Sequence, residues 1–416
     1  VAVLLCAALA CAAAMRLTSS HTTTSTRELL PSAIQVMPGS FAFLRGGQVY
    51  LGRAKSLPRQ LTSLGTPDPD PTHAGPITWA PDNRHLAVAI GAPLVARDAL
   101  ATATGTLYVV DTTTGATITV APRGAGQPGI AVGPSAYAWA DAHTLLYAAA
   151  GQLFSYSLAT RAATPVAGTT GLAVDLEVRG HTLYYMSYQP DAPLIVLPVG
   201  LHRHELATNA DGPVADLGQA QFEVTGCNTV GCEAAAGVPS LALAWDVSAD
   251  GTQLAYERIT AFAPDLSTAS ATFWYTAQGS AVPGATPTAT TAPPGASAPR
   301  AVFQGVPASL PAGVPGACCY LRFAPDGRGL VLSSGAEMPS PFGPYLVYTY
   351  ALTHGYQSGS PWAFGPAAWS PDAASFTLVI HYRGASTTDL LTYASQQTTV
   401  LQSDAYGCVW ANALPA

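Results

Sequence analysis

The stretch Phe323-Ala-Pro-Asp-Gly-Arg-Gly-Leu330 decides the fold, because close copies of it return along the chain. In each copy an apolar residue begins the unit and another ends it, seven positions later. A unit that recurs along a sequence is typical of a repeat architecture. The other strong copies are Trp79-Ala-Pro-Asp-Asn-Arg-His-Leu86, Val247-Ser-Ala-Asp-Gly-Thr-Gln-Leu254 and Trp369-Ser-Pro-Asp-Ala-Ala-Ser-Phe376.

The centre of the unit predicts a tight turn. Proline fixes φ, aspartate can accept a hydrogen bond from its own backbone two residues on, and glycine takes up positive φ. Two weaker copies run from Trp139 to Leu145, shorter by one residue, and from Leu176 to Leu183, where Glu-Val-Arg-Gly replaces the Pro-Asp-Gly turn. The aspartates of the strong copies are Asp82, Asp250, Asp326 and Asp372.

Strand-like runs follow the units. After Trp79 these runs are 86–90, 106–110 and 116–120, with Asp111-Thr-Thr-Thr-Gly115 as a turn between the last two. Four short strands joined by tight turns predict the blade of a β-propeller.

The ends of the chain complete this pattern. Residues 407–412, which include Trp410, look like the first strand of a further unit, and residues 41–45, 48–52 and 59–62 supply three strands that lack a first one. Joining them makes a seventh blade and removes exposed sheet edges. We therefore expect an all-β fold, a seven-bladed β-propeller of four-stranded antiparallel blades over residues 41–416.

These Trp-Ser-Pro-Asp-type units resemble the TolB-like or WD40-like propeller repeats of bacterial cell-envelope proteins. The resemblance covers roughly residues 41–412 and implies a propeller that works in the cell envelope. The motif encodes a turn and a packing residue, so it carries far less information about function than about fold.

The N-terminus predicts a membrane segment. Residues 1–15 are apolar and Arg16 closes the run, so residues 1–16 read as a signal anchor or signal peptide, followed by a Ser/Thr-rich linker over residues 17–40. Fifteen apolar residues fall short of the roughly 18–20 that span a bilayer, so retention, cleavage and lipidation at Cys11 stay open. We expect a membrane-anchored, extracytoplasmic protein, or a secreted one if the segment is cleaved.

Composition limits the partners. Charged residues are 10% of the chain, the net charge is −7, and Lys55 is the only lysine. No basic stripe is available to neutralise a phosphate backbone, so we expect no nucleic acid partner. The expected partners are a protein or glycan at the cell envelope, and the membrane itself through the N-terminal segment.

Cysteine spacing predicts cross-links. Cys227 and Cys232 are separated by four residues, and neither a second Cys pair nor a nearby His pair supports a zinc site, so a disulfide is favoured. Cys318 and Cys319 are adjacent; one of them could pair with Cys408, or they could form a vicinal disulfide or stay as buried thiols.

No residue is assigned to a catalytic, cofactor or metal site. His202 and His204 would share one face of a strand, but no third ligand is in sight. Asp68 and Asp70 lie in a proline-rich segment that reads as a linker rather than a calcium site. Serines in G-x-S contexts lack the second glycine of a hydrolase elbow.

The sequence therefore predicts a non-catalytic propeller that serves as a binding scaffold. The alternative is a propeller enzyme of the lyase, lactonase or dehydrogenase type with a central-channel site. Long insertions that share one face predict a binding face there. They are residues 92–105, 211–240, 260–271, 305–316 and 336–343, whereas residues 277–299 belong on the opposite face.

Overall fold

The structure is a computed structural model. It describes residues 39–53, 56–64, 77–91, 104–121, 130–131, 137–149, 152–188, 196–223, 238–239, 245–262, 269–277, 300–308, 320–335, 345–351, 355–357, 364–381, 388–394, 397–402 and 405–412. It divides into two units, Val1–Ile34 and Gln35–Ala416, and all described residues lie in the second. Within these ranges no helix is long and apolar enough to cross a membrane.

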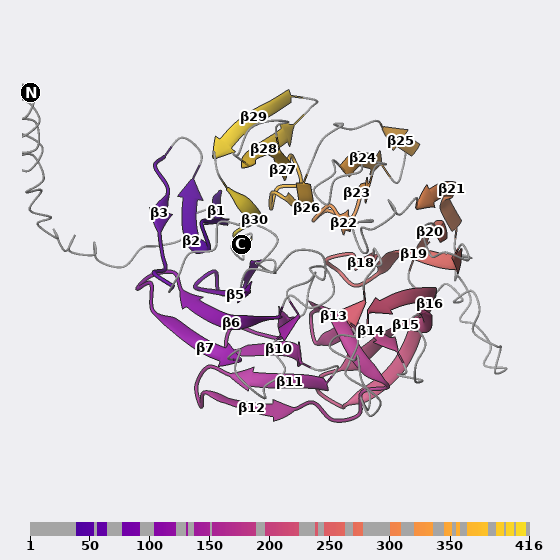
Figure 1. The fold of residues 1–416 in the computed structure, drawn as a ribbon, viewed down its shortest axis with the longest axis horizontal. Helices are drawn as coiled ribbons and strands as arrows, with labels where there is room; N and C mark the ends of the chain where they lie inside the picture. Colours follow the sequence, from indigo (N-terminus) through magenta and orange to yellow (C-terminus); the bar gives the residue numbers. More distant parts are fainter. Residues whose placement is uncertain are drawn as a thin grey trace, which may run out of the picture. The chain divides into compact units, whose positions relative to one another are not determined.

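The predicted all-β class with four-stranded antiparallel sheets is confirmed, because every regular element that the structure describes is a strand. One sheet joins the two ends of the described chain, in the order β3-β2-β1-β30. Its strands are β1 (Ser40–Arg45), β2 (Gln48–Arg53), β3 (Arg59–Gln60) and β30 (Tyr406–Trp410). Phe41 pairs with Trp410, so the first and last strands lie side by side (Figure 1).

Four further sheets follow the chain order, and their strands are antiparallel. The first contains β4 (Thr78–Trp79), β5 (His85–Gly91), β6 (Thr104–Asp111) and β7 (Thr117–Ala121), with β8 (Ile130–Ala131) paired to β6. The second contains β9 (Tyr137–Trp139), β10 (Thr144–Ala149), β11 (Gln152–Ser157) and β12 (Ala162–Pro165). The others contain β22 (Tyr320–Phe323), β23 (Gly329–Gly335), β24 (Tyr345–Ala351) and β25 (Gly355–Gln357), and β26 (Phe364–Trp369), β27 (Phe376–His381), β28 (Thr388–Ala394) and β29 (Gln397–Gln402).

The remaining strands form one nine-stranded sheet. They are β13 (Leu172–Arg179), β14 (Thr182–Tyr188), β15 (Val196–Glu205), β16 (Ala210–Glu223), β17 (Val238–Pro239), β18 (Trp245–Val247), β19 (Gln253–Phe262), β20 (Ala269–Ala277) and β21 (Arg300–Ala308). The runs β13–β16 and β18–β21 are each antiparallel, and a parallel pair between Gly218 and Ile259 joins them. Beside this pair, Asp216 accepts a 2.7 Å hydrogen bond from the guanidinium of Arg258.

The repeat turns have the geometry that their sequence requires. In all four strong copies an aspartate Oδ1 accepts a hydrogen bond from the backbone N–H two residues later, at 2.8 Å for Asp82 and 2.9–3.0 Å for the other three. The residue after each aspartate has positive φ: 55° at Asn83, 71° at Gly251, 67° at Gly327 and 56° at Ala373. The left-handed turn is therefore kept even where the sequence supplies no glycine.

The first and last apolar residues of a repeat copy face each other across the turn as partners in the sheet. Trp79 pairs with Leu86, and the same register holds for Val247 with Leu254, Phe323 with Leu330, Trp369 with Phe376 and, over its shorter turn, Trp139 with Leu145. The weaker copy from Leu176 to Leu183 does not have this register. Leu183 pairs with Val178, because Gly180 and His181 make a two-residue turn between Arg179 and Thr182.

One strand of each antiparallel run contacts its counterparts in the neighbouring runs, and we call these the inner strands: β30, β4, β9, β13, β18, β22 and β26. Indole N–H groups stabilise three of the junctions. Trp79 donates to the carbonyl of Val409 at 3.2 Å, and Trp139 donates to that of Thr78 at 3.2 Å. Trp369 likewise donates to the carbonyl of Arg322 at 3.3 Å. A buried tryptophan thus fills the space between sheets and satisfies its polar atom there.

Candidate functional site

Charged side chains gather on three consecutive inner strands. The residue just before the paired apolar position is Glu177 on β13, Asp246 on β18 and Arg322 on β22. The equivalent residues on the other four inner strands are uncharged: Thr78, Ala138, Ala368 and Val409. In a chain with 10% charged residues, this concentration at one side of the inner strands marks a candidate site.

Asp246 lies at the centre of this inner-strand cluster, which also includes Arg179. Its side chain is only 1% exposed. Its Oδ2 accepts a 2.5 Å hydrogen bond from the backbone N–H of Phe323 on the next inner strand. Glu177 Oε2 accepts one from the N–H of Val247 at 3.4 Å, so the same carboxylate-to-backbone contact occurs at two successive junctions.

Two guanidiniums complete the cluster. Arg179 donates to both carboxylates: to Glu177 Oε1, and to Asp246 Oδ1 at 3.3 Å. Its Nε also donates to the carbonyl of Val247 at 2.9 Å. Arg322 donates to the carbonyls of Leu321 at 2.9 Å and Trp245 at 3.4 Å. The side chains of Arg179 and Glu177 are 27% and 16% exposed, so solvent reaches the cluster on their side.

Burial and the nearby charge of Glu177 raise the pKa of the Asp246 carboxyl well above its usual value, although Arg322 and Arg179 act in the opposite direction. Asp246 therefore holds a proton under conditions in which an ordinary aspartate is ionised. With Asp246 neutral, two guanidiniums face one carboxylate, and the cluster carries a net positive charge.

Sequence reasoning missed this cluster. The sequence signal for the cluster is the charged residue that precedes the first apolar residue of a repeat copy. In the weaker copy that first apolar residue was placed at Leu176, whereas the structure has Val178 in the equivalent position, so Glu177 was not aligned with Asp246. The repeat residues themselves, Trp79, Trp139, Val247, Phe323, Trp369 and Trp410, lie on inner strands, and their aspartates lie in the turns.

Four of the cysteines considered for disulfides lie outside the described residues: Cys227, Cys232, Cys318 and Cys319. Cys408 on β30 is a free thiol. Burial raises the pKa of this thiol to about 12, against a hydrogen bond with Thr377 that lowers it. The pairing of Cys408 with Cys318 or Cys319, which lie outside the described residues, stays a prediction that the free thiol does not support.

His202 and His204 share one face of β15, and both approach Asp211 on β16. The distances from their Nδ1 atoms to the Asp211 carboxylate are 3.2 Å and 3.5 Å. Tyr185 and Thr170 also donate to this carboxylate, at 2.8 Å and 2.7 Å. Burial would raise the pKa of Asp211, but these hydrogen bonds outweigh it and the pKa lies below its usual value.

This arrangement explains His202 as part of a polar network, whereas neither ring nitrogen of the buried His204 has a hydrogen-bond partner among the residues that the structure describes. The Asp211 carboxylate already has several hydrogen-bond partners, so it offers little room for a cation. In the described part of the chain, no three His, Cys, Asp or Glu side chains are arranged to hold a metal ion. Asp68 and Asp70 lie outside that part.

No family model matches the chain. The search of curated proteins also gives no match. Among solved structures, TolB from Acinetobacter baumannii is similar at 10% identity and a TM-score of 0.44, over 90% of this chain and 67% of TolB. This similarity and the four-stranded antiparallel sheets confirm the predicted resemblance to TolB-like β-propellers, at the level of fold.

Enzymes share this similarity. Oligogalacturonate lyase in complex with manganese is 14% identical with a TM-score of 0.39, over 89% of this chain and 98% of the lyase. Porphyromonas gingivalis dipeptidyl peptidase 4 is 10% identical with a TM-score of 0.43, over 90% of this chain and 59% of the peptidase. The prediction that the chain is not an enzyme is therefore wrong, because structures similar to it include enzymes as well as TolB. The fold alone does not decide between the two.

Proposed function

We propose that the chain is a seven-bladed β-propeller that binds a protein or glycan of the cell envelope through the inner-strand cluster. The blade count is supported by the seven inner strands, each of which leads an antiparallel run of four. The hydrogen bond from Trp79 on β4 to Val409 on β30 supports closure between the first complete run and the run that joins the chain ends.

The concentration of charge on β13, β18 and β22 carries the proposal. Two guanidiniums beside a carboxyl whose pKa is raised favour an anionic group on the partner, such as an acidic side chain or an acidic sugar. The chain as a whole carries a net charge of −7, so the guanidiniums of the cluster would both attract an anionic group of the partner and fix the orientation in which the partner binds.

The proposed location is outside the cytoplasmic membrane. It rests on the apolar residues 1–15 and on the spacing of Cys227 and Cys232, which suits a disulfide in an oxidising compartment. Peptide mapping of the exported protein without reductant tests it. A linked Cys227–Cys232 peptide supports this location, and free thiols at both positions contradict it.

Capture from an envelope extract tests the binding. The immobilised chain is compared with Arg322→Gln, which removes a positive charge, and Glu177→Gln, which removes the negative one. We expect weaker capture of the same partner by Arg322→Gln and stronger capture by Glu177→Gln, with retention that falls as salt is raised. General loss of structure cannot produce these opposite signs.

Arg53→Gln is the matched control, because Arg53 is exposed on β2, in a different sheet from the cluster. It removes the same charge and should capture the partner as the parent does. Equal capture by all variants would contradict the assignment of the cluster as the binding site.

A catalytic role at the same cluster is the second candidate, and the raised pKa of Asp246 favours it. A carboxyl whose pKa is raised can act as a general acid. Acidic polysaccharides and lactones are suitable test substrates for the lyase and lactonase classes. Turnover that Asp246→Asn abolishes without lowering the melting temperature supports this role, and turnover that survives the substitution contradicts it.

A further inference from the structure

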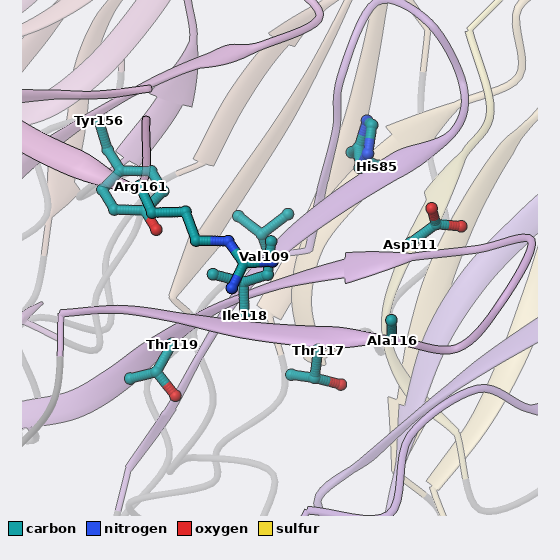
Figure 2. A pocket seen from close by; sticks show the side chains of 9 residues that line it. All are labelled: His85, Val109, Asp111, Ala116, Thr117, Ile118, Thr119, Tyr156 and Arg161. Atoms are coloured by element: carbon teal, nitrogen blue, oxygen red, sulfur yellow. The ribbon is translucent and has the colours of Figure 1, made fainter. Parts of the chain in front are cut away.

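A groove with a volume of about 530 Å³ lies between two neighbouring sheets, away from the inner-strand cluster. One wall comes from β5, β6 and β7, and the other from β11 and the turn that follows it. Figure 2 shows the side chains that line it. They are His85, Val109, Asp111, Ala116, Thr117, Ile118, Thr119, Tyr156 and Arg161.

The base of the groove rests on the core. Val109 and Tyr156 belong to the buried cluster between the two sheets, and Ile118 packs against that cluster. Since this base is continuous with the core, it is held in place by side chains from both sheets. A volume of several hundred Å³ is within the usual size range of a small-molecule site.

The negative charge at one end of the groove is already compensated. Asp111 accepts hydrogen bonds from Arg84 Nη2 at 2.8 Å and Nε at 3.1 Å. Burial would raise the pKa of Asp111, but hydrogen bonds from Thr113 and Arg84 hold it far below its usual value. His85 Nδ1 lies 2.8 Å from Asp82 Oδ2, which fixes that nitrogen as the donor and leaves Nε2 as an acceptor when the ring is neutral.

The positive charge in the groove is not compensated. Arg161 follows β11, and Figure 2 shows its side chain extended toward Val109 and Ile118. Its backbone is held in a left-handed turn, with φ of 54° and a 2.8 Å hydrogen bond from its N–H to the carbonyl of Ser157. No carboxylate among the described residues forms an ion pair with its guanidinium, so five N–H donors face solvent and the groove.

We propose that this groove binds a small organic carboxylate with a flat apolar body. The body would lie beside the half-buried Ile118, and the carboxylate would pair with Arg161. Charge complementarity carries the inference, because the one uncompensated charge among the lining residues is positive. This site is independent of the inner-strand cluster and does not require the function proposed for it.

The test compares 2-naphthoate with 2-naphthamide, a neutral probe of almost the same shape, by ligand-observed NMR titration of the full chain. We expect naphthoate to bind more tightly than naphthamide. Arg161→Gln should weaken naphthoate binding about tenfold and leave naphthamide unchanged, because one charge-assisted contact is lost. Arg53→Gln, an equal loss of charge on an exposed strand of another sheet, should change neither.

Melting temperatures of both variants establish that they are folded. Because Arg161 is exposed, Arg161→Gln should melt like the parent. The proposal is overturned if neither probe binds, if the two probes bind equally, or if Arg161→Gln and Arg53→Gln have the same effect. A loss of naphthoate binding in Arg322→Gln but not in Arg161→Gln would also overturn it, since the carboxylate would then bind at the inner-strand cluster.

Discussion

Asn83 connects a repeat turn to the end of the chain, and substituting it should reveal how much this connection stabilises the fold. It stands where two other copies of the turn have glycine, and its φ is 55°. Its side chain, in a residue only 4% exposed, donates from Nδ2 to the carbonyl of Asn412 at 3.0 Å. Its Oδ1 accepts from the N–H of Asn412 at 2.8 Å. Asn83→Gly would preserve the turn and remove both hydrogen bonds.

The expected destabilisation follows from these contacts. Each hydrogen bond contributes about 1 kcal/mol net. Glycine also relieves the strain of the left-handed conformation, but this raises the free energy of unfolding by less than about 1 kcal/mol. Asparagine already tolerates positive φ, and glycine increases the entropy of the unfolded chain. Asn83→Gly should therefore lose about 1–2 kcal/mol. In a chain of this length that corresponds to roughly 1–2 °C in melting temperature.

Ala373→Gly is the matched control, since Ala373 occupies the equivalent turn position with φ of 56° and has no side-chain hydrogen bond. It should stabilise the fold by about 0.5–1 kcal/mol. Calorimetry measures both shifts, and hydrogen exchange at the N–H of Ala411, which donates to Ser40, follows the closing strand directly. If Asn83→Gly is as stable as the parent, or if both variants shift in the same direction, the reasoning about this connection is refuted.

Three further predictions concern buried ionisable groups. Because the pKa of Asp246 is raised in the folded state, the folded protein keeps a proton that the unfolded chain loses. The free energy of unfolding should therefore fall as pH rises above about 4, by up to about 1.4 kcal/mol per pH unit. In denaturation experiments at a series of pH values, Asp246→Asn should flatten that slope. Cys408, with its pKa raised to about 12, should react slowly with iodoacetamide at pH 8 in the folded protein and faster after unfolding, as mass spectrometry would record. Rapid labelling of the native chain would contradict the raised pKa. Asp211→Ala should lower the free energy of unfolding by about 2–4 kcal/mol, because Tyr185, Thr170 and His202 lose their acceptor. Asp216→Ala should lower it by under about 1 kcal/mol in the same denaturation assay, because the Asp216 side chain is 39% exposed. Equal effects of the two substitutions would refute the network.

The repeat turns were predictable because they are local. Asp326 and Gly327 encode their turn within a few residues, and the structure has the hydrogen bond from Arg328 to Asp326 that this sequence implies. The pairing of the two chain ends could also be predicted, because strands without a partner at one end matched an unpartnered strand at the other.

Other features depend on register, which local sequence specifies poorly. Asp175 has φ of 52°, and the β13–β14 register shifts between Val174 and Leu176. Leu176 and Leu183, the first and last apolar residues of the weaker repeat copy, are therefore not partners in the sheet. The predicted insertion over residues 211–240 begins as strand, since β16 continues to Glu223. The inner-strand cluster and the groove each combine side chains from different sheets, and a pattern read along one strand cannot show them.

The parallel pair between β16 and β19 has a consequence for how the chain could be divided. Elsewhere, the inner strands of neighbouring runs meet through side chains, but here backbone pairing and the Asp216–Arg258 ion pair join the two runs. A polypeptide cut between β16 and β18 would thus separate the two runs at a seam that one backbone pair, Gly218 with Ile259, and one ion pair join. Reassembly of the two fragments would depend on these two contacts and on the contact between the inner strands β13 and β18.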